Sequence, residues 1–150
     1  MKMQTGSLPA QEPLRKASQV NKVRILLADD HPHVLEKVSQ LLEPAYEIVG
    51  TVTDGQSLVD AAARLRPDVL VIDITMPIMN GIEAANMLKE DGCESKIVFL
   101  TVHADPDYIR ACLATGAFGY VVKARTTTDL PRAIKEVLAG HIFISPTVST

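Results

Sequence analysis

The sequence predicts a three-layer α/β fold, in which a doubly wound parallel sheet of five strands carries helices on both faces. Short segments rich in β-branched residues are apolar at odd and even positions alike, which is typical of parallel strands covered on both faces. Longer segments between them have apolar residues at helical spacing. Repeated strand–helix units with short loops form parallel sheets with right-handed crossovers, so we expect that architecture here.

Each expected element has a local signal. The strands are expected at residues 23–28, 47–50, 69–72, 97–100 and 120–122. Apolar stripes predict helices over residues 34–42, 58–65 and 130–138, and shorter, weaker ones over 82–89 and 107–114. Asp54 is the expected N-cap of the second helix, and Gly140 follows the last one as a C-terminal glycine should.

Composition indicates one globular domain. The chain has 150 residues, 47% hydrophobic and 22% charged, and a formal net charge of -3. We expect the domain to span residues 22–144, preceded by a flexible N-terminal arm at 1–21. Residues 145–150 are expected to be the start of a linker or a C-terminal tail.

The same composition argues against several classes of protein. Cys93 and Cys112 have no partner at Cys-x-x-Cys spacing, which favours free thiols over a disulfide framework or a zinc cage. There is no secretory signal and no apolar run near the ~20 residues of a membrane helix, so we expect a cytoplasmic protein without a membrane partner. The absence of a basic stripe predicts that residues 1–150 do not bind DNA themselves.

Polar side chains end four of the five expected strands: Asp29 and Asp30 the first, Asp73 the third, Thr101 the fourth and Lys123 the fifth. Reactive groups in open parallel sheets gather beyond the carboxyl ends of the strands. Three carboxylates at one edge repel one another unless a cation compensates them. Mg²⁺ prefers oxygen ligands and takes one or two carboxylates, so we expect Asp30 and Asp73 to bind it directly and Asp29 through water.

These strand ends carry motifs that resemble the receiver domain of two-component response regulators. The motifs are ADDHP at residues 28–32, DITMP at 73–77 with Asn80-Gly81, Leu100-Thr101, and YVVK at 120–123. The resemblance covers residues 22 to about 144 and implies a flavodoxin-like fold with strand order 2-1-3-4-5. GAFGYVVK at 116–123, AIKEVLAG at 133–140 and ISP at 144–146 further resemble the NarL/FixJ branch, whose members usually continue into a helix-turn-helix. Control of transcription would then act through a DNA-binding domain absent from this chain.

The resemblance also implies roles for individual residues. Asp73 would be the phosphoacceptor for a sensor histidine kinase, with Lys123 and Thr101 assisting the phosphoryl transfer. Thr101 and Tyr120 would be the switch residues, and the backbone carbonyl of Thr75 a further Mg²⁺ ligand. The only chemistry expected is self-directed phosphotransfer and autodephosphorylation. A homodimer is possible through the fourth helix, fifth strand and fifth helix, or through the first and fifth helices.

Two more positions concern the lifetime of the phosphorylated state. Thr75 lies two residues after Asp73 and His103 two residues after Thr101, so both are expected to border the route of the hydrolytic water. His31 and His33 have the spacing of a metal-binding pair, but they flank a helix-start proline, which favours capping or surface positions.

Other functions stay open from the sequence. A stand-alone receiver or phosphorelay protein fits the same residues. A Mg²⁺-dependent aspartyl-phosphate hydrolase of the haloacid-dehalogenase kind is disfavoured, because such enzymes favour a second acid where Thr75 stands. A flavin-binding module is disfavoured because its phosphate would meet the acidic residues Asp29 and Asp30.

Overall fold

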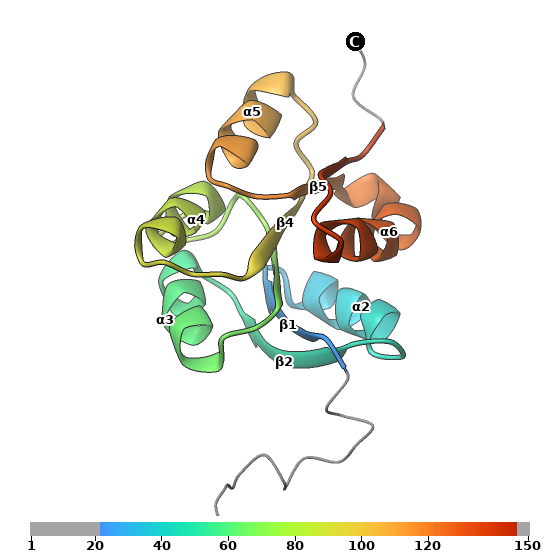
Figure 1. Ribbon diagram of the computed structural model, residues 1–150, viewed down its shortest axis with the longest axis horizontal. Helices are drawn as coiled ribbons and strands as arrows, with labels where there is room; N and C mark the ends of the chain where they lie inside the picture. The colour runs from blue at the N-terminus through green and yellow to red at the C-terminus, as the bar shows by residue number, and fades with distance from the viewer. Residues whose placement is uncertain (1–21, 147–150) are drawn as a thin grey trace, which may run out of the picture.

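The computed structural model describes residues 22–146, in which strands and helices alternate (Figure 1). In chain order the elements are β1 (Arg24–Ala28), α2 (Pro32–Leu42), β2 (Glu47–Val52), α3 (Gly55–Leu65), β3 (Val69–Ile72), α4 (Gly81–Glu90), β4 (Lys96–Thr101), α5 (Pro106–Ala114), β5 (Gly119–Val122), the 3₁₀ turn η2 (Lys123–Arg125), α6 (Thr126–Leu138) and β6 (Phe143–Ile144). The expected N-terminal arm and residues 147–150 lie outside the described residues.

The sheet has the order β2-β1-β3-β4-β5-β6, and every neighbouring pair is parallel. The predicted fold class and the relative order of the first five strands are confirmed. The structure has one short strand more than the five expected. This strand, β6, lies at the outer edge of β5, where Gly119 pairs with Phe143 and Tyr120 with Ile144. A strand of two residues is too short to carry a periodic signal.

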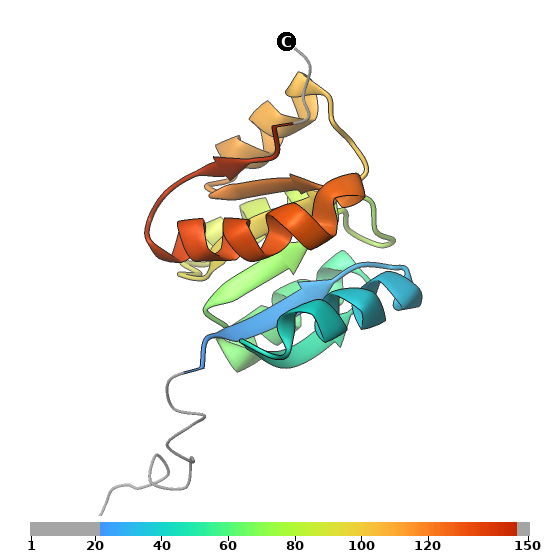
Figure 2. The same cartoon turned by 90° about the vertical axis from the view of Figure 1, so that its right-hand side faces the viewer.

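Helices cover the sheet on both faces. Helices α3, α4 and α5 lie on one side, and α2 and α6 on the other (Figures 1 and 2). Each side has its own apolar core, and the residues of one strand divide between them. Leu26 and Leu70 belong to the first core, whereas Ile25 and Val71 belong to the second. This division explains why the strands are apolar at both parities.

The helix ends follow local signals with one notable difference. The Asp54 carboxylate accepts a hydrogen bond from the Ser57 amide at 2.7 Å and caps α3 as predicted. Helix α6 begins at Thr126, four residues before the predicted stripe, and contains Pro131. Its first turn is polar and includes the buried acid Asp129, so the apolar spacing begins only at Leu130.

Two further findings bear on the sequence expectations. Cys93 and Cys112 are free thiols, and burial raises the pKa of Cys112 to about 12. Within residues 22–146 no helix has the length and apolar character that crossing a membrane requires.

Candidate functional site

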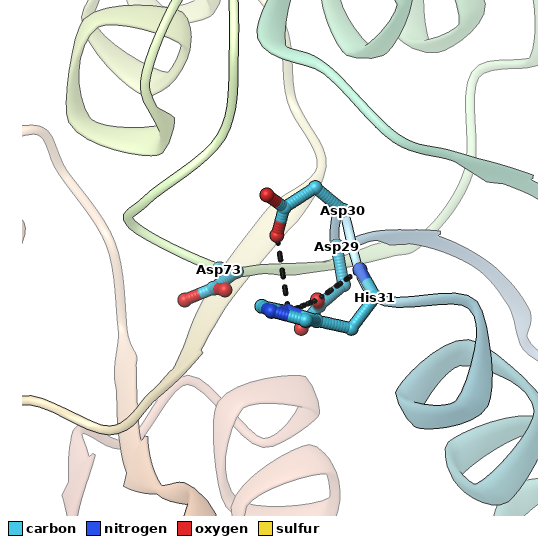
Figure 3. A group of neighbouring side chains, drawn as sticks. All are labelled: Asp29, Asp30, His31 and Asp73. Atoms are coloured by element: carbon cyan, nitrogen blue, oxygen red, sulfur yellow. Dashed lines mark hydrogen bonds and ion pairs between the residues drawn. The ribbon is translucent and has the colours of Figure 1, made fainter.

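Three carboxylates meet at the carboxyl edge of the sheet. Asp29 and Asp30 follow β1 and Asp73 follows β3, and the Asp73 amide donates to the Ala28 carbonyl at 2.9 Å, which keeps the two strand ends in register. Asp29 and Asp73 are buried. Figure 3 shows these acids and His31 turned toward one another, and one ligand atom from each of the four lies within 4.8 Å of the others.

Lys123 supplies the positive charge at this edge. Its ammonium lies 2.7 Å from Asp29 Oδ2 and 3.1 Å from Asp73 Oδ2. Burial and the charge of Asp29 raise the pKa of Asp73, and Lys123 offsets this only in part. Burial lowers the pKa of Lys123, but its bonds to Asp29 and Asp73 outweigh that effect and leave the pKa raised. The lysine is therefore charged at neutral pH. Its single positive charge does not balance the three carboxylates of the site.

The donor set fits a hard divalent cation. All three acids offer carboxylate oxygens, the ligands that Mg²⁺ prefers. Asp30 Oδ1 is shielded from solvent and has no hydrogen-bond partner within the described residues, so one strong acceptor is left for a cation. Asp73 Oδ1 accepts from the Ile74 amide at 2.7 Å, which orients the carboxylate.

His31 reaches this cluster, which the sequence did not predict. It occupies the N-cap position of α2, but its side chain makes no cap hydrogen bond. Nδ1 lies 3.0 Å from Asp29 Oδ1 and 3.1 Å from Asp30 Oδ1, although the latter contact lacks hydrogen-bond geometry. His33 does not belong to the cluster. His31 follows directly after two acids, and this is the one sequence signal that could have singled it out.

A second polar cluster surrounds His103. Its Nε2 lies 3.4 Å from Thr75 Oγ1, its amide donates to Thr101 Oγ1 at 3.3 Å, and its carbonyl accepts the Tyr120 hydroxyl at 2.7 Å. The imidazole stacks on Tyr108 with ring centroids 4.1 Å apart. His103 thus contacts Thr75, which is also expected to control the lifetime of the phosphoryl group, and both expected switch residues, Thr101 and Tyr120. Thr101 and Tyr120 are fully buried, and Tyr108 is a member that the sequence did not indicate.

The loop between β3 and α4 is held close to Asp73. The Gly81 amide donates to the Ile74 carbonyl at 2.7 Å, and Asn80 caps α4 through a reciprocal pair of bonds with Glu83. A Cβ at position 81 would lie 2.0 Å from the Asp73 carbonyl oxygen. Only glycine therefore allows this approach, which places the start of α4 against the acidic site.

Comparison with known proteins shows the family to which the chain belongs. Residues 25–135 match the protein family described as "Response regulator receiver domain". This chain belongs to the response regulator receiver family. As a receiver domain it is 37% identical to the transcriptional regulatory protein DegU of Brevibacillus brevis over 131 residues, which are 86% of this chain and 56% of DegU. The nitrate/nitrite response regulator protein NarL of Escherichia coli is 34% identical over 123 residues, 81% of this chain and 57% of NarL.

A solved structure agrees with this membership. A two-component response regulator of the LuxR family from Aurantimonas sp. SI85-9A1 superposes with a TM-score of 0.81 at 32% identity, covering 85% of this chain and 93% of that one. The predicted NarL/FixJ branch is confirmed, and the receiver domain is favoured over the hydrolase and flavin alternatives. The chain spans somewhat more than half the length of the curated relatives it matches.

Proposed function

We propose that a sensor histidine kinase phosphorylates this receiver domain on Asp73, and that the phosphorylated form controls transcription through a DNA-binding domain. The proposal places the protein in the cytoplasm. The observation that carries it is the buried Asp73 carboxylate, with Oδ2 3.1 Å from Lys123 Nζ and Asp29 beside it. Relatives named as transcriptional regulatory proteins, such as DegU, support the proposed output.

The transfer needs a nucleophile and a charge partner. An Asp73 carboxylate oxygen attacks the phosphorus of a phosphohistidine, so that a new O–P bond forms while the P–N bond breaks and the imidazole leaves with the electron pair. The Lys123 ammonium, already beside Asp73 Oδ2, balances negative charge on the phosphoryl oxygens. The Thr101 hydroxyl, at the end of the adjacent strand β4, donates a hydrogen bond to one of them.

The acidic cluster would hold the cation. Asp30, Asp73 and the Thr75 carbonyl would bind Mg²⁺ directly, and Asp29 would bind it through water. When bound, Mg²⁺ supplies charge neutralisation and orients the phosphoryl oxygens. The solvent-shielded Asp30 Oδ1, which accepts no hydrogen bond within the described residues, supports this assignment.

The switch would run through the cluster around His103. If the Thr101 hydroxyl moves to a phosphoryl oxygen, the His103 amide loses its acceptor, and the loop that holds the Tyr120 hydroxyl is released. Such a local change biases an existing equilibrium between two conformations. We propose the face of α5, β5 and α6 as the output surface, with dimerisation through that face or through α2 and α6.

Phosphate labelling tests the proposal. Incubation with acetyl phosphate and Mg²⁺ should label the wild-type chain and the control Asp91→Asn, which changes an exposed acid at the end of α4. Asp73→Asn and wild type treated with EDTA should stay unlabelled. Equal labelling of Asp73→Asn would show that another residue accepts the phosphoryl group.

A further inference from the structure

Asp129 is a buried acid that the acidic site does not use. It lies in the first turn of α6 with 0% of its surface exposed. Its carboxylate accepts from Arg125 Nε at 2.7 Å, from Arg125 Nη2 at 3.1 Å and from the Ser145 hydroxyl at 2.8 Å. Burial raises the pKa of Asp129, but the bonds from Arg125 and Ser145 outweigh it and leave the pKa lowered. A charge held at such a position depends on all of its partners.

One side of this network holds the turn that carries Lys123. Arg125 lies two residues after Lys123 in η2, so the ion pair with Asp129 ties that turn to α6. The Thr126 hydroxyl donates to the Lys123 carbonyl at 2.7 Å. The backbone of Lys123 is therefore fixed from the α6 side, while its ammonium reaches the acidic site.

The other side holds the end of β6. Ser145 is 1% exposed, and its hydroxyl accepts from the Val122 amide at 3.2 Å while donating to Asp129. The Ser145 amide donates to the Tyr120 carbonyl at 2.8 Å. Ser145 thus bonds to the residue immediately before Lys123 and to the backbone of the expected switch tyrosine. Ser145 is therefore packed against the rest of the domain.

We propose that Asp129 is a positioning residue that couples the placement of Lys123 to the docking of β6 and Ser145. The inference rests on the proposed function, because it assigns the docked strand to the conformation that binds a phosphoryl group best. Docked β6 keeps the Lys123 turn where its ammonium reaches Asp73. If docking of β6 strengthens the binding of a phosphoryl group by Lys123, a bound phosphoryl group must, by linkage, stabilise docked β6 equally.

The coupling has a consequence for the chain beyond the sheet. The chain continues from Ser145 toward its C-terminus, so an equilibrium between docked and released β6 changes where the following residues leave the domain. Occupation of Asp73 would then be transmitted along the backbone as well as across the surface of α5, β5 and α6.

The test uses the full chain and beryllofluoride as a phosphoryl mimic at fixed Mg²⁺. Ser145→Ala removes the bridging hydroxyl, and Asp129→Asn removes the charge. Glu136→Gln is the control, because Glu136 is a partly exposed acid of the same helix whose carboxylate, within residues 22–146, pairs with His141 and not with Arg125 or Ser145. Calorimetry measures the affinity for beryllofluoride, and hydrogen exchange follows the Phe143 amide, which donates to the Phe118 carbonyl immediately before β5. Beryllofluoride should slow that exchange about tenfold in wild type, and Ser145→Ala should weaken beryllofluoride binding about tenfold.

The outcomes separate a coupled role from a merely structural one. Asp129→Asn should act like Ser145→Ala, and Glu136→Gln like wild type. If Ser145→Ala speeds exchange at Phe143 but binds beryllofluoride within twofold of wild type, the coupling is overturned and β6 is only a structural strand. Ser145→Ala decides the question even if Asp129→Asn does not fold. A wild-type chain that neither binds beryllofluoride nor labels at Asp73 would overturn the proposed function as well.

Discussion

Asp73 occupies a position in which its ionised carboxylate lowers the stability of the fold. It is buried beside Asp29, and both features raise its pKa, while the Lys123 ammonium offsets them only in part. An ionised carboxylate in such a place destabilises the fold that holds it. A divalent cation bound there would relieve the excess negative charge.

We expect Asp73→Asn to stabilise the fold at neutral pH in the absence of divalent ions. Because the folded pKa lies above the ordinary value of 3.8, the folded state binds more protons than the unfolded state between these two values. Wild type therefore loses stability as the pH rises through that window. The variant should therefore melt at a higher temperature than wild type at pH 7, and at about the same temperature below the ordinary carboxyl pKa.

Thermal unfolding in EDTA at neutral and at acidic pH measures this difference, with Asp91→Asn as the control for loss of an acid. A variant less stable than wild type at pH 7 would mean that the pairing of Asp73 with Lys123 outweighs the repulsion.

Thr75 and His103 are expected to control how long the phosphoryl group stays. Their side chains approach one another at 3.4 Å, and the His103 ring is fixed by stacking on Tyr108. Replacing both Thr75 and His103 by alanine should expose the phosphorus to water and shorten the lifetime of the aspartyl phosphate about tenfold, which is ~1.4 kcal/mol in the barrier.

Phosphate release at fixed Mg²⁺ measures the lifetime, and His141→Ala serves as the control because that histidine is exposed and paired with Glu136. Lifetimes within a factor of about two of wild type would assign the control of hydrolysis to other residues.

At the scale of single elements, the start of α4 shows how the fold places its site. Helix α4 begins at Gly81 directly against the Asp73 carbonyl, with Asn80 and Glu83 satisfying its first amide groups. The capping bonds need only local sequence. The close approach needs a residue without a Cβ, because the nearest atom is backbone and cannot move aside.

Gly81→Ala should therefore lower the free energy of unfolding by about 3 kcal/mol, since the helix must shift to accommodate the methyl group. Gly50→Ala is the matched control, because its Cβ would meet the flexible Leu26 Cδ1 at 3.2 Å rather than backbone. Urea unfolding compares the two variants. Equal losses would show that the α4 connection yields more easily than the structure indicates.

For the molecule as a whole, the two faces of the sheet have different relations to the site. Helices α2 and α6 pack against one core, whereas α5 packs against the other and is joined to the site through the loop that contains His103. Lys123 and Tyr120 both belong to the segment around β5. A change at Asp73 therefore has a route to β5 and the start of α6 through Lys123, and the neighbouring Thr75 has a route to α5 through the His103 loop.

Beryllofluoride should accordingly alter hydrogen exchange most in residues 102–130, because they contain the His103 loop, α5, β5 and the start of α6. Exchange measured by mass spectrometry with and without the mimic gives the map, and residues 54–66 around α3 serve as the internal reference. Changes confined to residues 54–66 would contradict the proposed output surface.

The strands and the acidic edge could be predicted because their signals are local or follow from topology. Fully apolar strands predict a covered parallel sheet, and a parallel sheet gathers the residues after its strands at one edge. Asp29, Asp30, Asp73 and Lys123 could therefore be grouped from the sequence, and the structure brings all four together.

Contacts between distant residues were decided only by the tertiary structure. β6 has two residues, and the hydrogen bonds to β5, not periodicity, make it a strand. The ring of His31 lies against Asp29, and the Tyr120 hydroxyl donates to the His103 carbonyl. Asp129 lies just before the predicted helix at 130–138, and packing alone buries it with Ser145. Residue types and periods determine which elements form, whereas hydrogen-bond partners far apart in the chain are chosen by how those elements pack.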